Sequence, residues 1–103
     1  MMREGRGAMP TEIAGDFEWD VGKARANVRK HGVTFMDAAR AFLDPFAVDL
    51  SDTTRPERLI LLGMTMPERL LYVVYTERVS SGRLRIISAR RATRHEQKNY
   101  EER

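Results

Sequence analysis

The side chains of this 103-residue chain that could do chemistry are acids, bases and cations, because the sequence contains no cysteine. That absence excludes disulfide scaffolds, thiolate zinc sites and cysteine nucleophiles. The two histidines, His31 and His95, lie far apart and match no HExxH spacing. The sequence has no Walker loop and no GxSxG motif. The groups that remain are suited to chemistry on phosphate esters.

Asp16, Glu18 and Asp20 offer an alternative that involves a metal. They alternate along the chain, so they could lie on one face of a strand, and two carboxylates near Mg²⁺ would suit a nuclease. Asp20, however, stands where a helix N-cap is expected, and the other two lie near a chain end. We therefore expect no metal site and no other cofactor.

Cleaving RNA without a metal requires a base for the 2′-hydroxyl, an acid for the leaving 5′-oxygen and cations for the charge on phosphorus. His31 could be either acid or base, although a histidine at a helix C-terminus is equally explained as a cap. Tyr100 could stack on a base or move a proton, or only anchor the last helix. Lys23 is a further candidate, since Lys23, Asn27 and His31 are spaced along one ridge of a helix.

Positive charge is concentrated in the second half of the chain. The net charge of the whole chain is +3, yet residues 55–103 alone carry 11 basic and 6 acidic residues. Of the 18 basic residues in the whole chain, 15 are arginine. Guanidinium groups bind phosphate oxygens in pairs, so this distribution indicates a nucleic-acid partner, or else a solvated basic face. Arg85 and Arg90, which flank the core of the last predicted strand, are the candidate phosphate clamps. The other candidate RNA-binding cations in this half are Arg83, Arg91, Arg94 and Lys98.

Two helices are predicted near the N-terminus. The first runs from an N-cap at Asp20 to about His31, with Gly32 as a left-handed stop. The second follows Thr34, which resembles a capping box together with Asp37, and its apolar residues at 35, 38, 39, 42 and 43 recur with helical spacing. These two helices are expected to position the ridge that carries Lys23 and His31.

A third helix is predicted from a capping box of Thr93 and Glu96 to about Glu102. It has no apolar face, and a helix of that kind is marginal in water unless something docks it. Such places are often functional. Glu96 lies one turn before Tyr100, so the pair could face one partner, although Glu96 is also explained as a cap alone.

Strands are predicted at residues 17–19, 46–50, 59–66, 70–76 and 84–89. Short loops between consecutive strands indicate antiparallel pairing. The predicted fold class is therefore α+β, in the order β-α-α-β-β-β-β-α, with the helices against one side of an antiparallel sheet. Trp19 is expected in the core.

The length of the chain and its N-terminal segment indicate how many domains it has and whether it enters a membrane. Residues 1–15 show no periodicity and are predicted to be a disordered leader, so that a single domain covers residues 16–103. The apolar run at residues 59–62 is too short to span a bilayer, and the N-terminus has no apolar signal region. We expect a cytoplasmic protein without a membrane partner.

Several short motifs, in order and at compatible spacing over residues 17–102, resemble the BrnT family of type II toxin–antitoxin systems. They are FEWD at 17–20, the Lys23 and Asn27 spacing, KHGVTF at 30–35, Asp44-Pro45, Glu57-Arg58, Gly63, YTE at 75–77, RIISARRAT at 85–93, Glu96 and YEE at 100–102.

The resemblance implies a RelE-like fold and a toxin that inhibits translation by cleaving RNA. It also implies a hetero-oligomer with a BrnA-like antitoxin, whose ribbon-helix-helix segment contacts operator DNA, so that the pair represses its own operon. By motif position, the resemblance assigns the site to Lys23, His31, Arg85, Arg90 and Tyr100, with Arg69 as a further RNA-binding residue.

Two other functions fit the same residues. A non-catalytic nucleic-acid-binding module needs the basic surface but no groups for proton transfer. A structural partner of a DNA-binding subunit needs neither.

Overall fold

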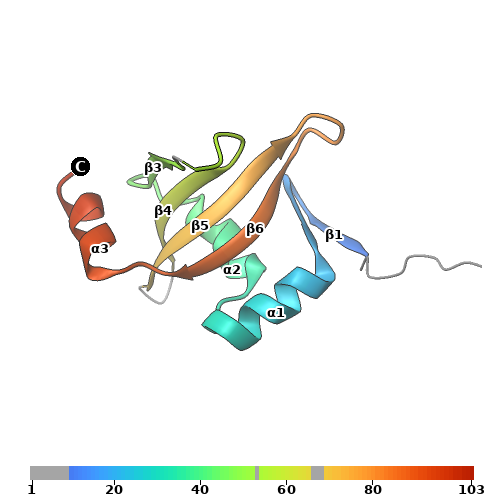
Figure 1. Cartoon of the computed structure of the whole chain (residues 1–103), viewed down its shortest axis with the longest axis horizontal. Helices are drawn as coiled ribbons and strands as arrows, with labels where there is room; N and C mark the ends of the chain where they lie inside the picture. The colour runs from blue at the N-terminus through green and yellow to red at the C-terminus, as the bar shows by residue number, and fades with distance from the viewer. Residues whose placement is uncertain (1–9, 53, 66–68) are drawn as a thin grey trace, which may run out of the picture.

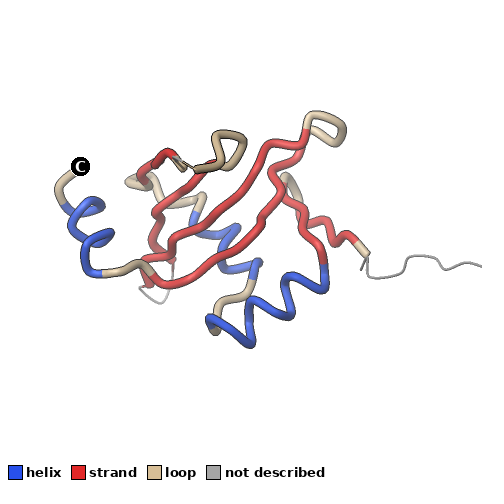
Figure 2. Tube along the Cα trace, viewed as in Figure 1, coloured by secondary structure: helices blue, strands red, loops and turns tan. Residues whose placement is uncertain are grey.

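The computed structural model describes residues 10–52, 54–65 and 69–103, which form a six-stranded sheet with helices α1 and α2 packed on one side (Figure 1). The elements are β1 (Thr11–Ala14), β2 (Phe17–Asp20), α1 (Val21–His31), α2 (Phe35–Ala41), β3 (Val48–Ser51), β4 (Leu59–Thr65), β5 (Arg69–Arg78), β6 (Arg83–Arg91) and α3 (Arg94–Glu101). The strand order is β1-β2-β6-β5-β4-β3. Helix α3 lies apart from the other two, beyond the end of β6 (Figure 2).

The predicted limits of α1 are confirmed at both ends. The carboxylate of Asp20 accepts a hydrogen bond from the backbone N–H of Lys23 at 2.9 Å, as an N-cap does. Gly32 ends the helix with φ of 68°, a conformation that glycine adopts at little cost. Its N–H donates to the carbonyl of Val28.

Helix α2 packs very closely on β4. Thr34 caps it by accepting from the N–H of Asp37. A Cβ atom at Gly63 would lie only 2.4 Å from the carbonyl oxygen of Ala41, so glycine is needed at this point of β4. The helical spacing predicted through Leu43 is wrong at its last position, because α2 ends at Ala41 and leaves Leu43 80% exposed.

The core lies between the sheet and the two helices. Its fully buried members include Phe35 of α2 and Leu71, Val73 and Ala89 of the central strands. Trp19 is 3% exposed and packs edge-on against Phe35, with 6.0 Å between the ring centroids. Its predicted core position is confirmed.

The α+β class and the element order predicted from residue 17 onward are confirmed. Most neighbouring strands are antiparallel as expected, but β2 and β6 run parallel. These two strands are separated along the chain by α1, α2 and three further strands. The rule that short loops join antiparallel neighbours therefore does not apply to them.

The disordered leader predicted for residues 1–15 is wrong over its last part. Thr11–Ala14 forms β1, which pairs with all four residues of β2. Glu12 also accepts a hydrogen bond from the indole N–H of Trp19 at 3.1 Å. A four-residue edge strand with three exposed residues has no hydrophobic periodicity, so pattern reading cannot detect it. Residues 1–9 lie outside the described residues.

Candidate functional site

A β-bulge places Arg85 and Arg90 on the same face of the sheet. The two are five residues apart, and in a regular strand an odd spacing puts side chains on opposite faces. The register between β5 and β6 shifts between Val74 and Tyr75, so Arg85 lies opposite Thr76 and Arg90 opposite Tyr72. Both positions face away from the core. We call this side of the sheet, with Arg85, Arg90 and Tyr72, the open face.

Arg85 is bound to a buried glutamate. Its Nη1 lies 2.6 Å from Oε2 of Glu18 on the neighbouring strand β2, and the hydroxyl of Ser81 donates to the other carboxylate oxygen at 2.8 Å. Glu18 is 5% exposed. Hydrogen bonds from Ser81 and then Arg85 hold the pKa of Glu18 below its usual value. Arg85 therefore stabilises a buried charge in addition to lying on the open face.

Arg90 is held between an aromatic ring and a helix. Its guanidinium carbon lies 3.9 Å from the centroid of Tyr72, and two of its N–H groups donate to the two carboxylate oxygens of Glu96, each at 2.9 Å. Glu96 also accepts from the N–H of Thr93, which completes the predicted capping box. Burial alone would raise the pKa of Glu96, but the bonds from Arg90 and Thr93 outweigh it and lower that pKa.

Tyr100 attaches the far end of α3. Its hydroxyl donates to Oδ2 of Asp44 at 2.5 Å, and Asp44 also accepts from the backbone N–H groups of Met64 and Phe46. Burial, followed by the bond to Asp44, raises the pKa of Tyr100, so the hydroxyl stays protonated. This contact accords with the anchoring alternative for Tyr100.

The ridge of Lys23, Asn27 and His31 divides into one inward and two outward residues. Asn27 is buried, and its side-chain amide bonds to both the N–H and the carbonyl of Ala89 and to the carbonyl of Val33. These bonds satisfy the backbone groups of Ala89, in a part of β6 that does not pair with β2. Lys23 and His31 are exposed. No hydrogen bond or ion pair between described residues joins them to Arg85, Arg90 or Tyr100.

The other predicted RNA-binding residues are spread over the surface. Arg69 forms an ion pair with Asp37 of α2 at 2.8 Å, on the helix side of the sheet. Arg83 ends up half-buried, whereas Arg91, Arg94 and Lys98 are exposed. These four cations form no ion pair with any other residue in the described ranges.

The carboxylates of the metal alternative have separate partners. Glu18 pairs with Arg85, Asp20 caps α1, and Asp16 contributes its backbone carbonyl to the N–H of Leu84. Within residues 10–52, 54–65 and 69–103, no group of three or more His, Cys, Asp or Glu residues could hold a metal ion. None of the helices in these ranges is long and apolar enough to cross a membrane.

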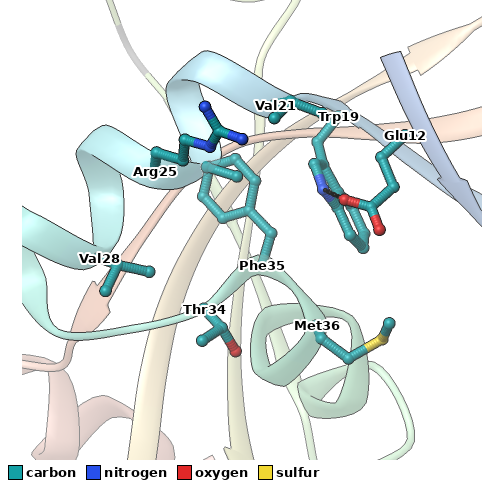
Figure 3. A pocket seen from close by; sticks show the side chains of 9 residues that line it. Glu12, Trp19, Val21, Arg25, Val28, Thr34, Phe35 and Met36 are labelled. Carbon is teal, nitrogen blue, oxygen red and sulfur yellow. Dashed lines mark hydrogen bonds between the residues drawn. The ribbon is translucent and has the colours of Figure 1, made fainter. Parts of the chain in front are cut away.

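A pocket of about 350 Å³ lies on the helix side, between α1, α2 and the β1–β2 hairpin. Of the side chains that line it (Figure 3), Trp19 and Phe35 are buried, whereas Val28 and Met36 are exposed. Its charged side chains are Arg25 and Glu12, which have opposite signs. An apolar hollow with balanced charge does not suit a phosphate backbone, so the open face is the better candidate for RNA.

Most of the chain matches a known protein family. The model of the family described as the ribonuclease toxin BrnT of type II toxin–antitoxin systems matches residues 19–96. The chain belongs to the BrnT family. A solved structure of the Brucella abortus ribonuclease toxin BrnT is similar, with a TM-score of 0.59 and 27% sequence identity over 74% of this chain and 94% of that one. The comparison with curated proteins found no match.

The BrnT match includes most of the predicted site but not its end. Lys23, His31, Arg69, Arg85 and Arg90 lie inside residues 19–96, whereas Lys98 and Tyr100 lie beyond them. Strand β1 also falls outside the matched residues.

Sequence reasoning missed two partners that the site depends on. Tyr72 supports Arg90 from the neighbouring strand, and Asp44 receives the hydroxyl of Tyr100. Counting back from the turn between β5 and β6 could have paired Tyr72 with Arg90, but only if the bulge were known. Nothing in the sequence links Asp44 to Tyr100.

Proposed function

We propose that this BrnT-family chain is a metal-independent endoribonuclease that inhibits translation by cleaving RNA. The observation that carries the proposal is the bulge that brings Arg85 and Arg90 to one face of the sheet. Two guanidinium groups on a shared face can contact successive parts of a phosphate backbone. Two exposed cations of α3, Arg94 and Lys98, add positive charge in the helix that follows β6.

The proposed reaction is transesterification by the 2′-hydroxyl of the substrate. A base removes the hydroxyl proton as the oxygen attacks phosphorus, and an acid donates a proton to the departing 5′-oxygen. The products are a 2′,3′-cyclic phosphate and a free 5′-hydroxyl. In this proposal His31 transfers a proton, while Lys23, Arg85 and Arg90 stabilise the charge that develops on phosphorus.

The link between α1 and β6 supports placing these groups in one site. Asn27 lies one turn from both Lys23 and His31, and it is bonded to Ala89, the residue next to Arg90. Helix α1 therefore cannot shift along β6 without breaking buried hydrogen bonds. An RNA strand that crosses this edge of β6 can contact α1 and the open face together.

The proposed partner is a BrnA-like antitoxin that covers the arginines with an acidic segment, since complementary charge favours such a contact. Its ribbon-helix-helix segment would contact operator DNA, so that the hetero-oligomer represses its own operon. The site of action would be the cytoplasm.

The experiment is incubation of the purified chain with RNA, with and without EDTA, followed by analysis of the product ends. We expect cleavage in EDTA and a 2′,3′-cyclic phosphate. Loss of cleavage in EDTA with recovery in Mg²⁺ would overturn metal independence. RNA binding without any product would favour the non-catalytic module.

His31→Ala tests the proton-transfer role, with Lys30→Ala as the matched control on the next exposed residue of α1. We expect His31→Ala to reduce cleavage by roughly a hundredfold or more while RNA binding holds. Lys30→Ala should cleave like the parent protein. Equal activity of the two variants would leave His31 as a helix cap only.

A further inference from the structure

The contact between Arg90 and Glu96 has the geometry of an arginine bound to a phosphate. Two N–H groups of one guanidinium point at two oxygens of one anion, each at 2.9 Å. Carboxylates and phosphodiesters both accept this paired arrangement. In the free protein, therefore, the carboxylate of Glu96 takes the place on Arg90 that an RNA phosphate would need.

The helix that brings Glu96 to Arg90 is weakly attached. Helix α3 has eight residues and none of them is buried. A helix of this length is not stable by itself in water. Its polar side-chain contacts to the sheet and loops are the pair of Glu96 with Arg90 and the bond of Tyr100 to Asp44. Just after the helix, the guanidinium of Arg103 lies 5.0 Å from the ring centroid of Phe46. Figure 1 shows α3 beyond the end of the sheet, away from α1 and α2.

Arg90 keeps its place when Glu96 leaves. Its guanidinium rests on the ring of Tyr72, which belongs to the central strand β5 and does not depend on α3. The side chains of Arg90 and Glu96 are 35% and 15% exposed, so the pair is accessible to a competing anion. Glu96 also retains its bond from Thr93, and the first turn of α3 can stay capped after the exchange.

We propose that Arg90 and Tyr72 form a phosphate-binding subsite for the RNA backbone, which Glu96 and α3 close in the free protein. A phosphodiester replaces the Glu96 carboxylate on Arg90, and α3 is released from the open face. The inference rests on the proposed RNA substrate, and it adds that α3 is an autoinhibitory cover rather than a catalytic element.

Glu96→Gln tests the cover without removing the helix cap, because glutamine also serves at this position of a capping box. The probe is a single-stranded oligonucleotide with 2′-O-methyl riboses, which can bind but cannot be cleaved by 2′-hydroxyl attack. We expect Glu96→Gln to bind it about two- to fivefold more tightly than the parent protein, since the partly buried carboxylate of Glu96 no longer competes for Arg90. Glu101→Gln, on the exposed side of α3, removes the same charge and is the matched control.

Hydrogen exchange provides the second readout. Saturating oligonucleotide should accelerate exchange of the backbone amides of α3 in the parent protein, while amides of β5 remain protected. Three results would each overturn the proposal that α3 covers Arg90. They are equal affinities of Glu96→Gln and Glu101→Gln, unchanged exchange in α3, and no oligonucleotide binding in any variant.

The outcome is distinguishable from a failure of the proposed function. If unmodified RNA is cut but the two glutamine variants bind alike, the nuclease proposal stands and the cover fails. If RNA is never cut but Glu96→Gln binds more tightly and α3 is released, the cover stands and the nuclease proposal fails.

Discussion

Arg85 and Arg90 lie on the same strand and the same face, and each is paired with a glutamate, yet the two pairs differ in what holds the glutamate. Glu18 belongs to a strand in the sheet and is 5% exposed. Glu96 belongs to a helix with no buried residue. Glu18 cannot move away from Arg85 without disturbing a strand of the sheet, whereas Glu96 can move away from Arg90 together with one short helix.

The difference teaches that a basic motif cannot be interpreted from its arginines alone. The strand 83–91 offers two similar guanidinium groups, but one is committed to a buried charge and the other to a replaceable one. Removing Arg85 leaves a buried carboxylate without its partner, which costs more than losing the less buried pair of Arg90 and Glu96. Loss of toxicity in an Arg85 variant is therefore ambiguous until its stability is measured.

The largest expected loss of stability is that of Arg85→Ala, which leaves the carboxylate of Glu18 buried without the guanidinium that pairs with it. We expect the free energy of unfolding to fall by about 2–4 kcal/mol and the melting temperature by more than about 10 °C. Arg90→Ala should cost only about 1–2 kcal/mol, from the partly buried pair with Glu96 and the contact with Tyr72. Thermal and urea unfolding followed by circular dichroism measure both changes.

A second substitution shows whether the stranded charge is the cause. Adding Glu18→Gln to Arg85→Ala should recover part of the lost stability, since it removes the uncompensated carboxylate. If Arg90→Ala destabilises the protein as much as Arg85→Ala, the two pairs are equivalent and the comparison is wrong.

A smaller effect is expected on the pH dependence of stability. The pKa of Glu18 is lowered by the hydrogen bonds from Ser81 and Arg85, so the folded protein favours the ionised form. The stability from this carboxylate is present above its unfolded pKa of about 4.5 and is lost as the pH falls through the lower folded value. Glu18→Gln should therefore lose less stability than the parent protein between about pH 5 and pH 3.

Glu96→Gln provides the contrast in the same titration. The pKa of Glu96 is also lowered, because the bonds from Arg90 and Thr93 outweigh its burial. Its more exposed position allows water and salt to screen the pair. We expect the acid unfolding curve of Glu96→Gln to stay close to that of the parent protein. A curve flatter than that of Glu18→Gln would show that α3 is firmly attached.

Much of the local structure could be predicted because it depends on neighbouring residues. The caps at Asp20, Gly32, Thr34 and Thr93 all act over a few positions, and each is confirmed. The absence of an apolar face on α3 was also visible in the sequence, and none of the residues of this helix is buried.

The partners of the site residues could not be predicted because they depend on register. The bulge in β6 decides that Arg85 and Arg90 share a face, and the parallel pairing of β2 with β6 decides that Glu18 meets Arg85. Neither feature has a local signal. The sequence placed Asn27 on the same helix as Lys23 and His31, and α1 contains all three. Only the packed structure shows that the Asn27 side chain points inward and bonds to Ala89.

The smallest expected effect is that of Tyr100→Phe. Tyr100 is the second residue that attaches α3, and this variant keeps its ring and removes only its hydroxyl. Asp44 then retains the N–H groups of Met64 and Phe46 as donors. We therefore expect a loss of only about 0.5–1.5 kcal/mol. That loss should appear as faster hydrogen exchange in α3, with the core unchanged.

Tyr100→Phe also separates an anchor from a proton donor. If the hydroxyl only holds α3, the variant should still arrest growth on induced expression, as should Asn99→Ala, which alters an exposed neighbour on the same helix. The cover predicts in addition that releasing this end of α3 does not weaken oligonucleotide binding, since Arg90 and Tyr72 remain in place. A Tyr100→Phe protein that is folded and binds RNA but no longer cleaves it would instead place the hydroxyl in the chemistry. The bond to Asp44 would then be a resting position from which Tyr100 reaches the substrate.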